Sequence, residues 1–243
     1  MGAHYVAAVE AQWGPDAVTR SPGMRERARL DAHERIRSAA TALLAERSLN
    51  DLTTREIAER AGVSEATLFR CVESKHALLV LAYGDRVDAL LDRIEEADQR
   101  TAAAMTQPAG EFYCQRVLDA FWLRSDLYLE SPENAAMYLN AGVGQNVTDS
   151  PSLRRSIGQV GRLVDMIADM LRAGQRAGCL RGEFSADLIA VNCHGTYTDE
   201  MQRSIKRGWG TDSFRKRLDE RLRVQLFPLA VAQAGKTREA QGG

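Results

Sequence analysis

The sequence lacks an excess of charge of either sign, because its 32 basic and 33 acidic side chains leave a formal net charge of −1. Nucleic-acid binders often carry a strongly basic balance, so any DNA binding here must depend on the geometry of a motif. A long hydrophobic run is also missing: the longest, 77–83, falls far short of the roughly 20 residues that span a bilayer. No basic region followed by an apolar one marks a secretory signal. We therefore expect a cytoplasmic globular protein with no membrane partner.

Paired cysteines and catalytic signatures are missing as well. The cysteines, which favour small buried residues in a reducing compartment over a metal or redox centre, are Cys71, Cys114, Cys179 and Cys193. The sequence contains no G-x-S-x-G, P-loop, H-E-x-x-H or dinucleotide glycine fingerprint. Cys193 and His194 are adjacent, and side chains about 100° apart on a helix make a poor metal chelate. The sequence thus predicts no enzyme activity, no catalytic residue, no metal and no cofactor.

Helical periodicity runs through the chain, and no segment has the two-residue period of a strand. We predict helices over 30–44, 53–61, 65–71, 75–94, 111–125, 134–141, 151–177, 186–206 and 212–234. Ser150 and Pro151 form an N-cap followed by proline at the first helical position, and Pro228 is a potential kink in the last helix. The fold class expected from the periodicity is all-α.

Residues 53–71 have the spacing of a helix-turn-helix. Thr53 and Glu56 are spaced as a capping box, Gly62 ends the first helix where a left-handed backbone is needed, and Ser64 is a good N-cap for the second. The predicted seam between the helices is Ile57, Ala61, Val63 and Leu68, and the predicted outward face of the second helix is Glu65, Ala66, Thr67, Phe69 and Arg70. Such a polar, small and cationic face can enter the major groove and read base edges.

The segments 53–69 and 74–79 closely resemble the N-terminal domain of the TetR family of bacterial transcriptional regulators. The resemblance rests on the capping Thr, the Gly-Val-Ser turn, the Thr-Leu-aromatic core of the second helix and the Ser-Lys start of the next one. Cys71 stands where the family usually has Tyr or His, Val72 where it usually has Phe, and His76 where an acidic residue is common. Cys71 and Val72 provide less apolar packing beneath the predicted helix 65–71 than the residues usual in the family, although both side chains can still be buried.

The resemblance implies an all-α protein with an N-terminal three-helix helix-turn-helix DNA-binding domain and a larger helical-bundle domain for effector binding and dimerisation. We divide the chain into a flexible N-terminal extension, a DNA-binding domain, a ligand-binding and dimerisation domain and a disordered tail, over 1–28, 29–76, 77–235 and 236–243. A basic cluster precedes the first predicted helix: Arg20, Arg25, Arg27 and Arg29. We interpret it as a solvated tail, with a minor-groove arm as the alternative and Met24 as a second potential start of the chain.

The family resemblance also implies a homodimeric repressor that binds a near-palindromic double-stranded operator through the 65–71 recognition helix. A small apolar or amphipathic effector is expected to release it. The last two long helices are expected to pack on their copies in a four-helix bundle. The candidate seam residues are Leu188, Ile189, Val191, Leu218, Leu222, Leu226 and Leu229. A helical protein-interaction module and an effector-independent DNA-binding protein without enzymatic activity remain alternatives.

The candidate DNA-binding residues are Thr53, Thr54, Glu65, Ala66, Thr67, Phe69, Arg70 and Lys75. Lys75 lies in the first turn of a helix, where its ammonium group and the free backbone N–H groups can bind one phosphate. Thr54 and Thr67 suit phosphate hydrogen bonds, which set register. Arg70 can span O6 and N7 of guanine, and a phosphate contact is equally open. Glu65 can accept a hydrogen bond from a cytosine amine, but a favourable interaction with the helix dipole is the preferred interpretation.

The second domain carries most of the aromatic and sulfur side chains, at a spacing that indicates core before anything else. The family resemblance implies that some of them surround a cavity. The candidates for its lining are Tyr113, Trp122, Tyr138 and Met166. Few cationic residues lie on these apolar faces, which favours an apolar or amphipathic effector over a polyanion.

Overall fold

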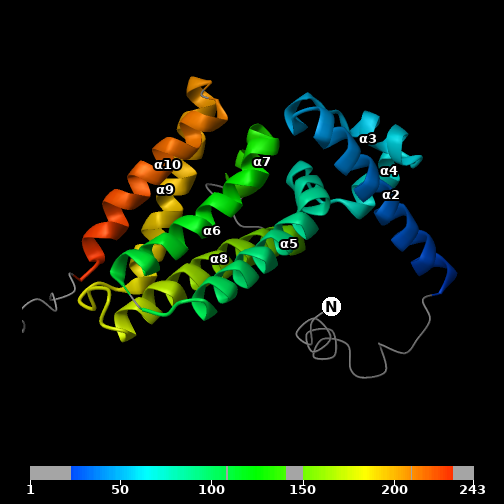
Figure 1. Cartoon of the computed structure of the whole chain (residues 1–243). Coiled ribbons are helices and arrows are strands. Elements are labelled where there is room, and N and C mark those ends of the chain that lie inside the picture. The colour runs from blue at the N-terminus through cyan, green and yellow to red at the C-terminus, as the bar shows by residue number, and fades with distance from the viewer. Residues whose placement is uncertain (1–22, 108, 141–149, 209, 232–243) are drawn as a thin grey trace, which may run out of the picture.

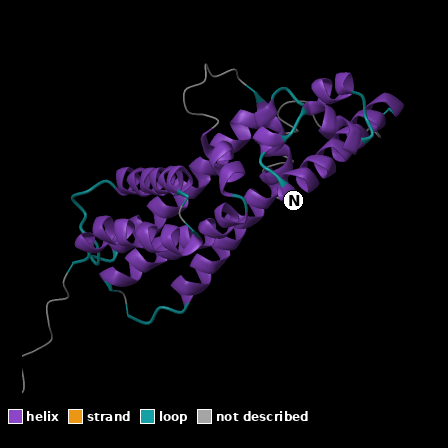
Figure 2. Ribbon diagram, turned by 90° about the horizontal axis from the view of Figure 1, so that it is seen from above, coloured by secondary structure: helices purple, strands orange, loops and turns teal. Residues whose placement is uncertain are grey.

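The computed structural model describes residues 23–107, 109–140, 150–208 and 210–231, and their regular structure is entirely helical (Figures 1 and 2). The elements are α2 (Met24–Glu46), the 3₁₀ turn η2 (Leu49–Asp51), α3 (Thr54–Ala61), α4 (Glu65–Cys71), α5 (Lys75–Ala103), α6 (Gly110–Glu130), α7 (Pro132–Asn140), α8 (Pro151–Arg176), α9 (Ala186–Arg207), α10 (Thr211–Leu226) and the 3₁₀ turn η3 (Phe227–Leu229). The all-α prediction is confirmed. Across those four ranges, each helix is too short or too polar to span a bilayer.

The helices form two packed groups that share α5. In Figure 1 the small group α2–α4 lies at one end of the molecule and the pair α9 and α10 at the other. The N-terminal cluster buries Ile36, Ile57 and Leu68 together with the first turns of α5 as far as Tyr83. A second, larger cluster begins at Leu90 of the same helix and continues through α6, α8, α9 and α10. A three-helix unit attached to a helical bundle is therefore the architecture of this chain.

The first described helix begins earlier than the sequence predicts. α2 starts at Met24, within the segment assigned to the extension, and Arg25, Arg27 and Arg29 lie on this helix. The prediction of a tail or arm is therefore wrong for these three arginines. Arg29 instead donates to the carboxylate of Glu26 one turn away, with its Nη2 2.7 Å from Oε1. The predictions for residues 1–22, including Arg20, lie outside the described residues.

The last helix ends earlier than predicted, because Pro228 terminates it. Proline has no backbone N–H to donate, and its ring clashes with the preceding turn. α10 therefore stops at Leu226, and a single 3₁₀ turn, Phe227–Leu229, follows. Pro228 ends the helix instead of kinking it. The predicted tail over 236–243 lies outside the described residues.

The apolar face of α10 packs inside the protomer. Leu218, Leu222 and Leu226 are fully buried, and Leu229 is buried as well, so the prediction that they form a seam between subunits is wrong. A core face and a subunit seam have the same helical period, and the protomer itself covers the one apolar stripe that α10 possesses.

The cysteines are all free thiols. Cys114 and Cys193 are buried, whereas Cys71 and Cys179 are half-buried. Burial raises the pKa of the Cys114 thiol to about 11 and that of Cys193 to about 12, so both remain protonated at neutral pH. Within the part of the chain that the structure describes, no cluster of His, Cys, Asp and Glu is arranged to hold a metal ion.

Candidate nucleic-acid interface and effector cavity

The turn between α3 and α4 is built by local capping, as the sequence predicts. The backbone N–H of Thr53 donates to Glu56 Oε2 at 2.8 Å, and the backbone N–H of Glu56 donates to Thr53 Oγ1 at 3.2 Å, which completes the capping box. Gly62 has φ +63°, in the left-handed region that favours glycine. Ser64 Oγ accepts from the backbone N–H of Thr67 at 3.2 Å and begins α4. The capping box thus fixes the start of α3, and Gly62 and Ser64 define the two ends of the turn.

A contact from outside the motif supports the same turn. Arg35 of α2 donates through Nη1 to the carbonyl oxygen of Gly62 at 3.1 Å and to that of Ala61 at 3.4 Å. The guanidinium thus satisfies carbonyl groups at the C-terminus of α3, where a positive charge is also favoured by the helix dipole. Sequence reasoning missed Arg35, because nothing in its local pattern shows which carbonyl groups it meets.

The outward face of α4 reaches solvent. Glu65, Ala66 and Arg70 are exposed, and Phe69 is 62% exposed although it is a large apolar residue. Leu68, on the opposite side of the helix, is buried in the N-terminal cluster. This division gives α4 one face that anchors it and one that is available to a partner.

The polar side chains around that face hold one another in place. Arg70 Nη2 donates to Thr67 Oγ1 at 3.0 Å, and Thr54 Oγ1 donates to Glu65 Oε2 at 3.2 Å. Thr53 is exposed and Thr54 is partly buried. Lys75 is the first residue of α5. The hydrogen bond from Thr54 to Glu65 therefore joins the start of α3 to the exposed face of α4.

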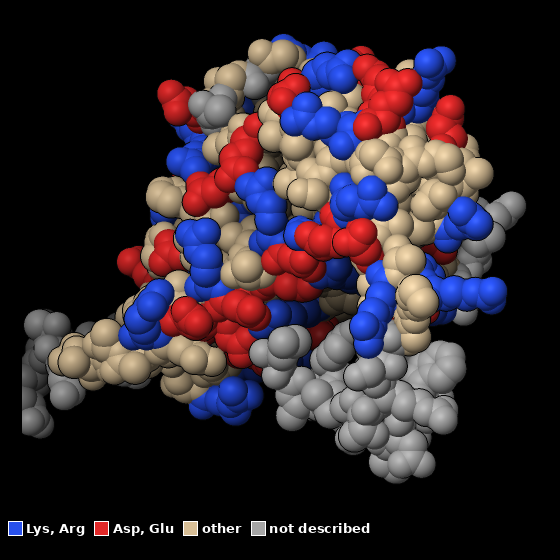
Figure 3. All heavy atoms as spheres, turned by 90° about the vertical axis from the view of Figure 1, so that its right-hand side faces the viewer, with Lys and Arg blue, Asp and Glu red and all other residues tan. Residues whose placement is uncertain are grey.

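Charge is not concentrated at this end of the molecule. Figure 3 looks onto the side that carries α2–α4, where basic and acidic side chains alternate without a continuous band of one sign. Several arginines there are paired with acids, such as Arg55 with Glu59 at 2.8 Å and Arg47 with Glu56 at 3.1 Å. Recognition of a polyanion by this surface must therefore depend on where individual donors stand.

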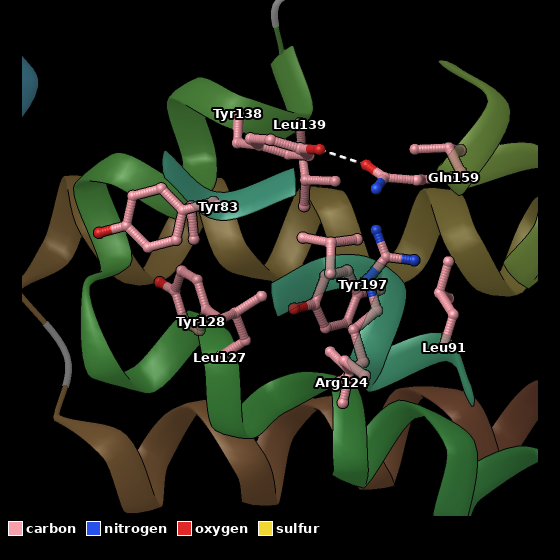
Figure 4. Close-up of a pocket in the computed structure, with 13 residues that line it drawn as sticks. Tyr83, Leu91, Arg124, Leu127, Tyr128, Tyr138, Leu139, Gln159 and Tyr197 are labelled. Carbon is pink, nitrogen blue, oxygen red and sulfur yellow. Dashed lines mark hydrogen bonds between the residues drawn. The ribbon is translucent and has the colours of Figure 1, made fainter. Parts of the chain in front are cut away.

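A cavity of about 50 Å³ lies where the bundle meets the N-terminal unit (Figure 4). Helices α5, α6, α7, α8 and α9 all contribute to its walls, mainly with aliphatic side chains and the rings of four tyrosines, which are Tyr83, Tyr128, Tyr138 and Tyr197. Two further polar side chains line it, those of Arg124 and Gln159. Tyr138 donates its hydroxyl hydrogen bond to Gln159 Oε1 across the cavity.

One of the four predicted lining residues, Tyr138, lines this cavity. Tyr113 is buried elsewhere in the core, Trp122 is 45% exposed on the surface, and Met166 packs against the outside of the larger cluster. Apolar periodicity cannot separate core from lining, so the sequence alone does not show which of these side chains face this cavity. Arg124 was missed, although an arginine three residues after Phe121 on a buried helical face is a visible signal.

Among the residues that line the cavity, Arg124 is the one that carries a charge at neutral pH. Burial raises the pKa of Tyr128 to about 12 and also raises that of Tyr138, so both phenols stay protonated. Burial, and then the Arg124 charge, lower the pKa of the neighbouring His194 to about 4. That imidazole is therefore neutral as well. Burial also lowers the pKa of Arg124, but a guanidinium remains protonated in proteins.

A buried amide connects the cavity wall to the N-terminal unit. Asn134 of α7 is 1% exposed, and its Oδ1 accepts from the backbone N–H of Leu49 at 2.8 Å. Its Nδ2 lies 3.1 Å from the carbonyl oxygen of Leu44 and 3.2 Å from that of Arg47, at the end of α2. Tyr83, whose ring lines the cavity, donates its hydroxyl to the same Leu44 oxygen at 3.3 Å. Two walls of the cavity are thus bonded to the backbone of the N-terminal unit.

Comparison with known proteins gives a consistent result. The sequence model for bacterial regulatory proteins of the tetR family matches residues 36–82. An uncharacterized HTH-type transcriptional regulator, YvkB of Bacillus subtilis, is 30% identical over 148 residues, which cover 58% of this chain and 69% of the relative.

Solved structures share the fold over most of this chain. Thermus thermophilus FadR, a TetR-family transcriptional repressor in complex with lauroyl-CoA, is 24% identical with a TM-score of 0.60, over 87% of this chain and 100% of that one. Bacillus subtilis FadR in complex with stearoyl-CoA is 16% identical with a TM-score of 0.57, over 79% and 97%. A choline-bound putative regulator from Saccharomonospora viridis is 23% identical with a TM-score of 0.53, over 78% and 94%. At these identities the likeness supports the three-helix unit and the bundle as a common fold.

Proposed function

Because this chain belongs to the TetR family of bacterial transcriptional regulators, we propose that it is a homodimeric repressor released from its operator by a small amphipathic effector. Proteins of this family are regulators and not enzymes, and they bind DNA and small-molecule effectors. The observation that carries the proposal is the exposed face of α4, held on a turn that is capped at both ends. The DNA-binding domain comprises α2–α4 and the first turns of α5, which share one buried cluster.

In this proposal α4 enters the major groove with Arg70 reading a base and Thr67 beside it. Thr54 and Lys75 contact the phosphates on either side and set the register. Phe69 makes an apolar contact with a sugar or a thymine methyl group, and Ala66 allows close approach of the helix. Thr53 lies at the cap of α3, and Glu65 stays near the N-terminus of α4, where the dipole favours it.

The proposed dimer uses the surface of α9 and α10 at the far end from the DNA-binding domain (Figure 1). Large apolar side chains are exposed there: Leu188 is 66% exposed, Val191 53% and Val224 76%. Residues 188 and 191 are three apart, so both lie on one face of α9. A two-fold axis through this face places two recognition helices about 34–36 Å apart, one duplex turn, on a near-palindromic operator.

Charging this surface is expected to separate the subunits. The double variant Leu188→Glu, Val191→Glu places two carboxylates of each subunit in the proposed interface. Burying a charged group that has no partner costs more free energy than the interface supplies. We expect sedimentation velocity to show a monomer that has lost tight operator binding. Ile157→Glu on α8, where the side chain is 53% exposed, is the matched control and stays dimeric. A double variant that remains a dimer would place the interface elsewhere.

Effector binding requires the cavity to expand. A volume of about 50 Å³ has room for a few water molecules, whereas small-molecule sites occupy about 300 Å³ or more. The shortest helix in the wall is α7, with 9 residues, and Tyr138 and Leu139 on it face the cavity. A ligand that displaces α7 also disturbs Asn134 and its bonds to the end of α2. The effector thereby favours a domain separation that no longer matches the operator.

Selection from fragments of the host genome tests the DNA-binding proposal and does not require the operator sequence to be known. The purified full-length protein is expected to enrich fragments that share an inverted repeat, and a gel shift with that repeat should show a retarded complex. Two structural neighbours are complexes with lauroyl-CoA and stearoyl-CoA, so acyl amphiphiles are the first compounds to add. They should release the protein from the DNA and remove the retarded band. If no sequence is enriched over several rounds, the protein is not a sequence-specific repressor.

A further inference from the structure

Arg124 is a buried cation without an acidic partner. Its exposed fraction is 9%, and the groups around its guanidinium are neutral: the Tyr197 ring, whose centroid is 4.7 Å away, and the His194 Nδ1 atom, 3.4 Å from Nη1. Within the described ranges, no carboxylate lies within 4.0 Å of it, the distance that defines a salt bridge. An unpaired buried charge costs several kcal/mol of stability by rough estimate, so its retention calls for a reason.

The other buried charges among the described residues are paired. Arg116 is equally buried, but its Nε and Nη2 donate to the two carboxylate oxygens of Asp98 at 2.6 and 2.8 Å. Glu200 is fully buried and accepts from Arg217 at 2.7 Å and from Arg221 at 2.8 Å. Against these two sites Arg124 is the exception, and it lines the cavity that the four tyrosines share.

The guanidinium points into the cavity. Figure 4 shows it above the Tyr197 ring, directed toward Gln159 and the Tyr138 hydroxyl on the opposite wall. Gln159 is committed to the protein, because its Nε2 donates to Gly84 O at 2.9 Å and to Asp88 Oδ1 at 2.6 Å. The free N–H donors of a guanidinium match a carboxylate, which can accept two of them side by side. An apolar cavity whose one charged group is a guanidinium therefore suits a molecule with an apolar body and one anionic end.

We infer that the cavity binds an amphipathic organic monoanion, with its carboxylate on Arg124 and its apolar body among the aliphatic side chains of α5–α8. This inference rests on the proposed effector site and specifies the class of effector. The single positive charge of the lining is matched by one negative charge, and a neutral acyl thioester would leave it unpaired. The present volume accommodates the charged end alone, so the apolar body enters as the α7 wall moves away.

Direct binding to the full-length protein in the absence of DNA tests the inference. Isothermal titration and thermal unfolding are measured with octanoate, dodecanoate and hexadecanoate, each below its critical micelle concentration. Dodecanol, dodecyl phosphate and lauroyl-CoA are the comparison ligands. We expect at least one carboxylate to bind, and to bind about tenfold or more tighter than the alcohol of matched length, since a hydrogen bond to a charged group contributes about 1.5–3 kcal/mol. Equal affinity for the alcohol, tighter binding of the phosphate or the thioester, or no binding by any carboxylate would overturn the inference.

Substitution of Arg124 separates a ligand anchor from a structural residue. Arg124→Met should lose about 10- to 100-fold in carboxylate affinity and keep its affinity for dodecanol, while Arg124→Lys retains part of the preference. The unliganded Arg124→Met protein should unfold at the same or a higher temperature, because removing an unpaired buried charge relieves its desolvation cost. Arg93→Met, at an exposed arginine of α5, is the control and behaves as wild type.

Two outcomes tell the inference apart from the proposed function. A lower melting temperature of Arg124→Met with unchanged carboxylate affinity would assign Arg124 a purely structural role and overturn the inference. Conversely, carboxylates that bind through Arg124 but leave the operator complex intact in a gel shift would refute the effector role and leave the binding site established.

Discussion

Replacing Arg70 by alanine is expected to weaken operator binding by about 1–3 kcal/mol, roughly 5- to 150-fold, the range for a good bidentate contact between arginine and guanine. The residue is exposed on α4, and in the free protein its Nη2 donates to Thr67 Oγ1 at 3.0 Å. That bond orients the guanidinium near the outward face without burying it. Alanine is a good helix former, so the fold and the assembly state should be unchanged.

Titration of wild type and Arg70→Ala against the selected operator and against scrambled DNA distinguishes the two possible roles of this arginine. A base contact predicts that the variant loses specificity, with one position of the operator relaxed. A phosphate contact predicts uniform weakening on both DNAs and a smaller salt dependence. Arg93→Ala, on the bundle part of α5, is the control for loss of one positive charge. If Arg70→Ala binds the operator as tightly as wild type, α4 is not oriented in the groove as proposed.

Replacing Asn134 by leucine is expected to destabilise the protein and to weaken communication between its two parts. Leucine has a similar volume but leaves the N–H of Leu49 without the partner that the amide supplies, whereas the carbonyl oxygen of Leu44 keeps the Tyr83 hydroxyl. Each buried group left without a partner costs on the order of 1–3 kcal/mol. Urea unfolding should show a lower midpoint. Asn50→Leu, at an exposed asparagine of η2, provides the matched control and should unfold like wild type.

The same variant tests the path between cavity and DNA. Asn134 lies on the helix that carries Tyr138 and Leu139 of the cavity wall, so its loss should reduce the difference in operator affinity with and without effector. Operator affinity is measured at saturating and at zero effector, and the ratio of the two is the coupling. An unchanged unfolding midpoint together with an unchanged ratio would show that α7 does not transmit the signal through this amide.

The helix-turn-helix could be read from the sequence because its determinants are local. The capping box joins residues three apart, Gly62 needs its left-handed backbone whatever surrounds it, and Ser64 caps its own helix. Such features are short-range hydrogen bonds and backbone preferences, and they predicted α4 to the residue. The contacts of Arg35 with Gly62 and of Asn134 with Leu49 join residues 27 and 85 positions apart, and no local sequence pattern predicts them.

The sequence by itself determined that this chain is all-α and carries a capped helix-turn-helix, because periodicity and capping act within a few residues of one another. Tertiary packing alone decided which apolar faces are core, cavity or surface, since all three have the same helical period. It buried the leucines of α10, placed Trp122 on the surface, and brought Tyr138 and Arg124 to the walls of one cavity. Whether a buried arginine meets an acid depends on which helices pack against it, and among the helices that the structure describes none brings an acid to Arg124.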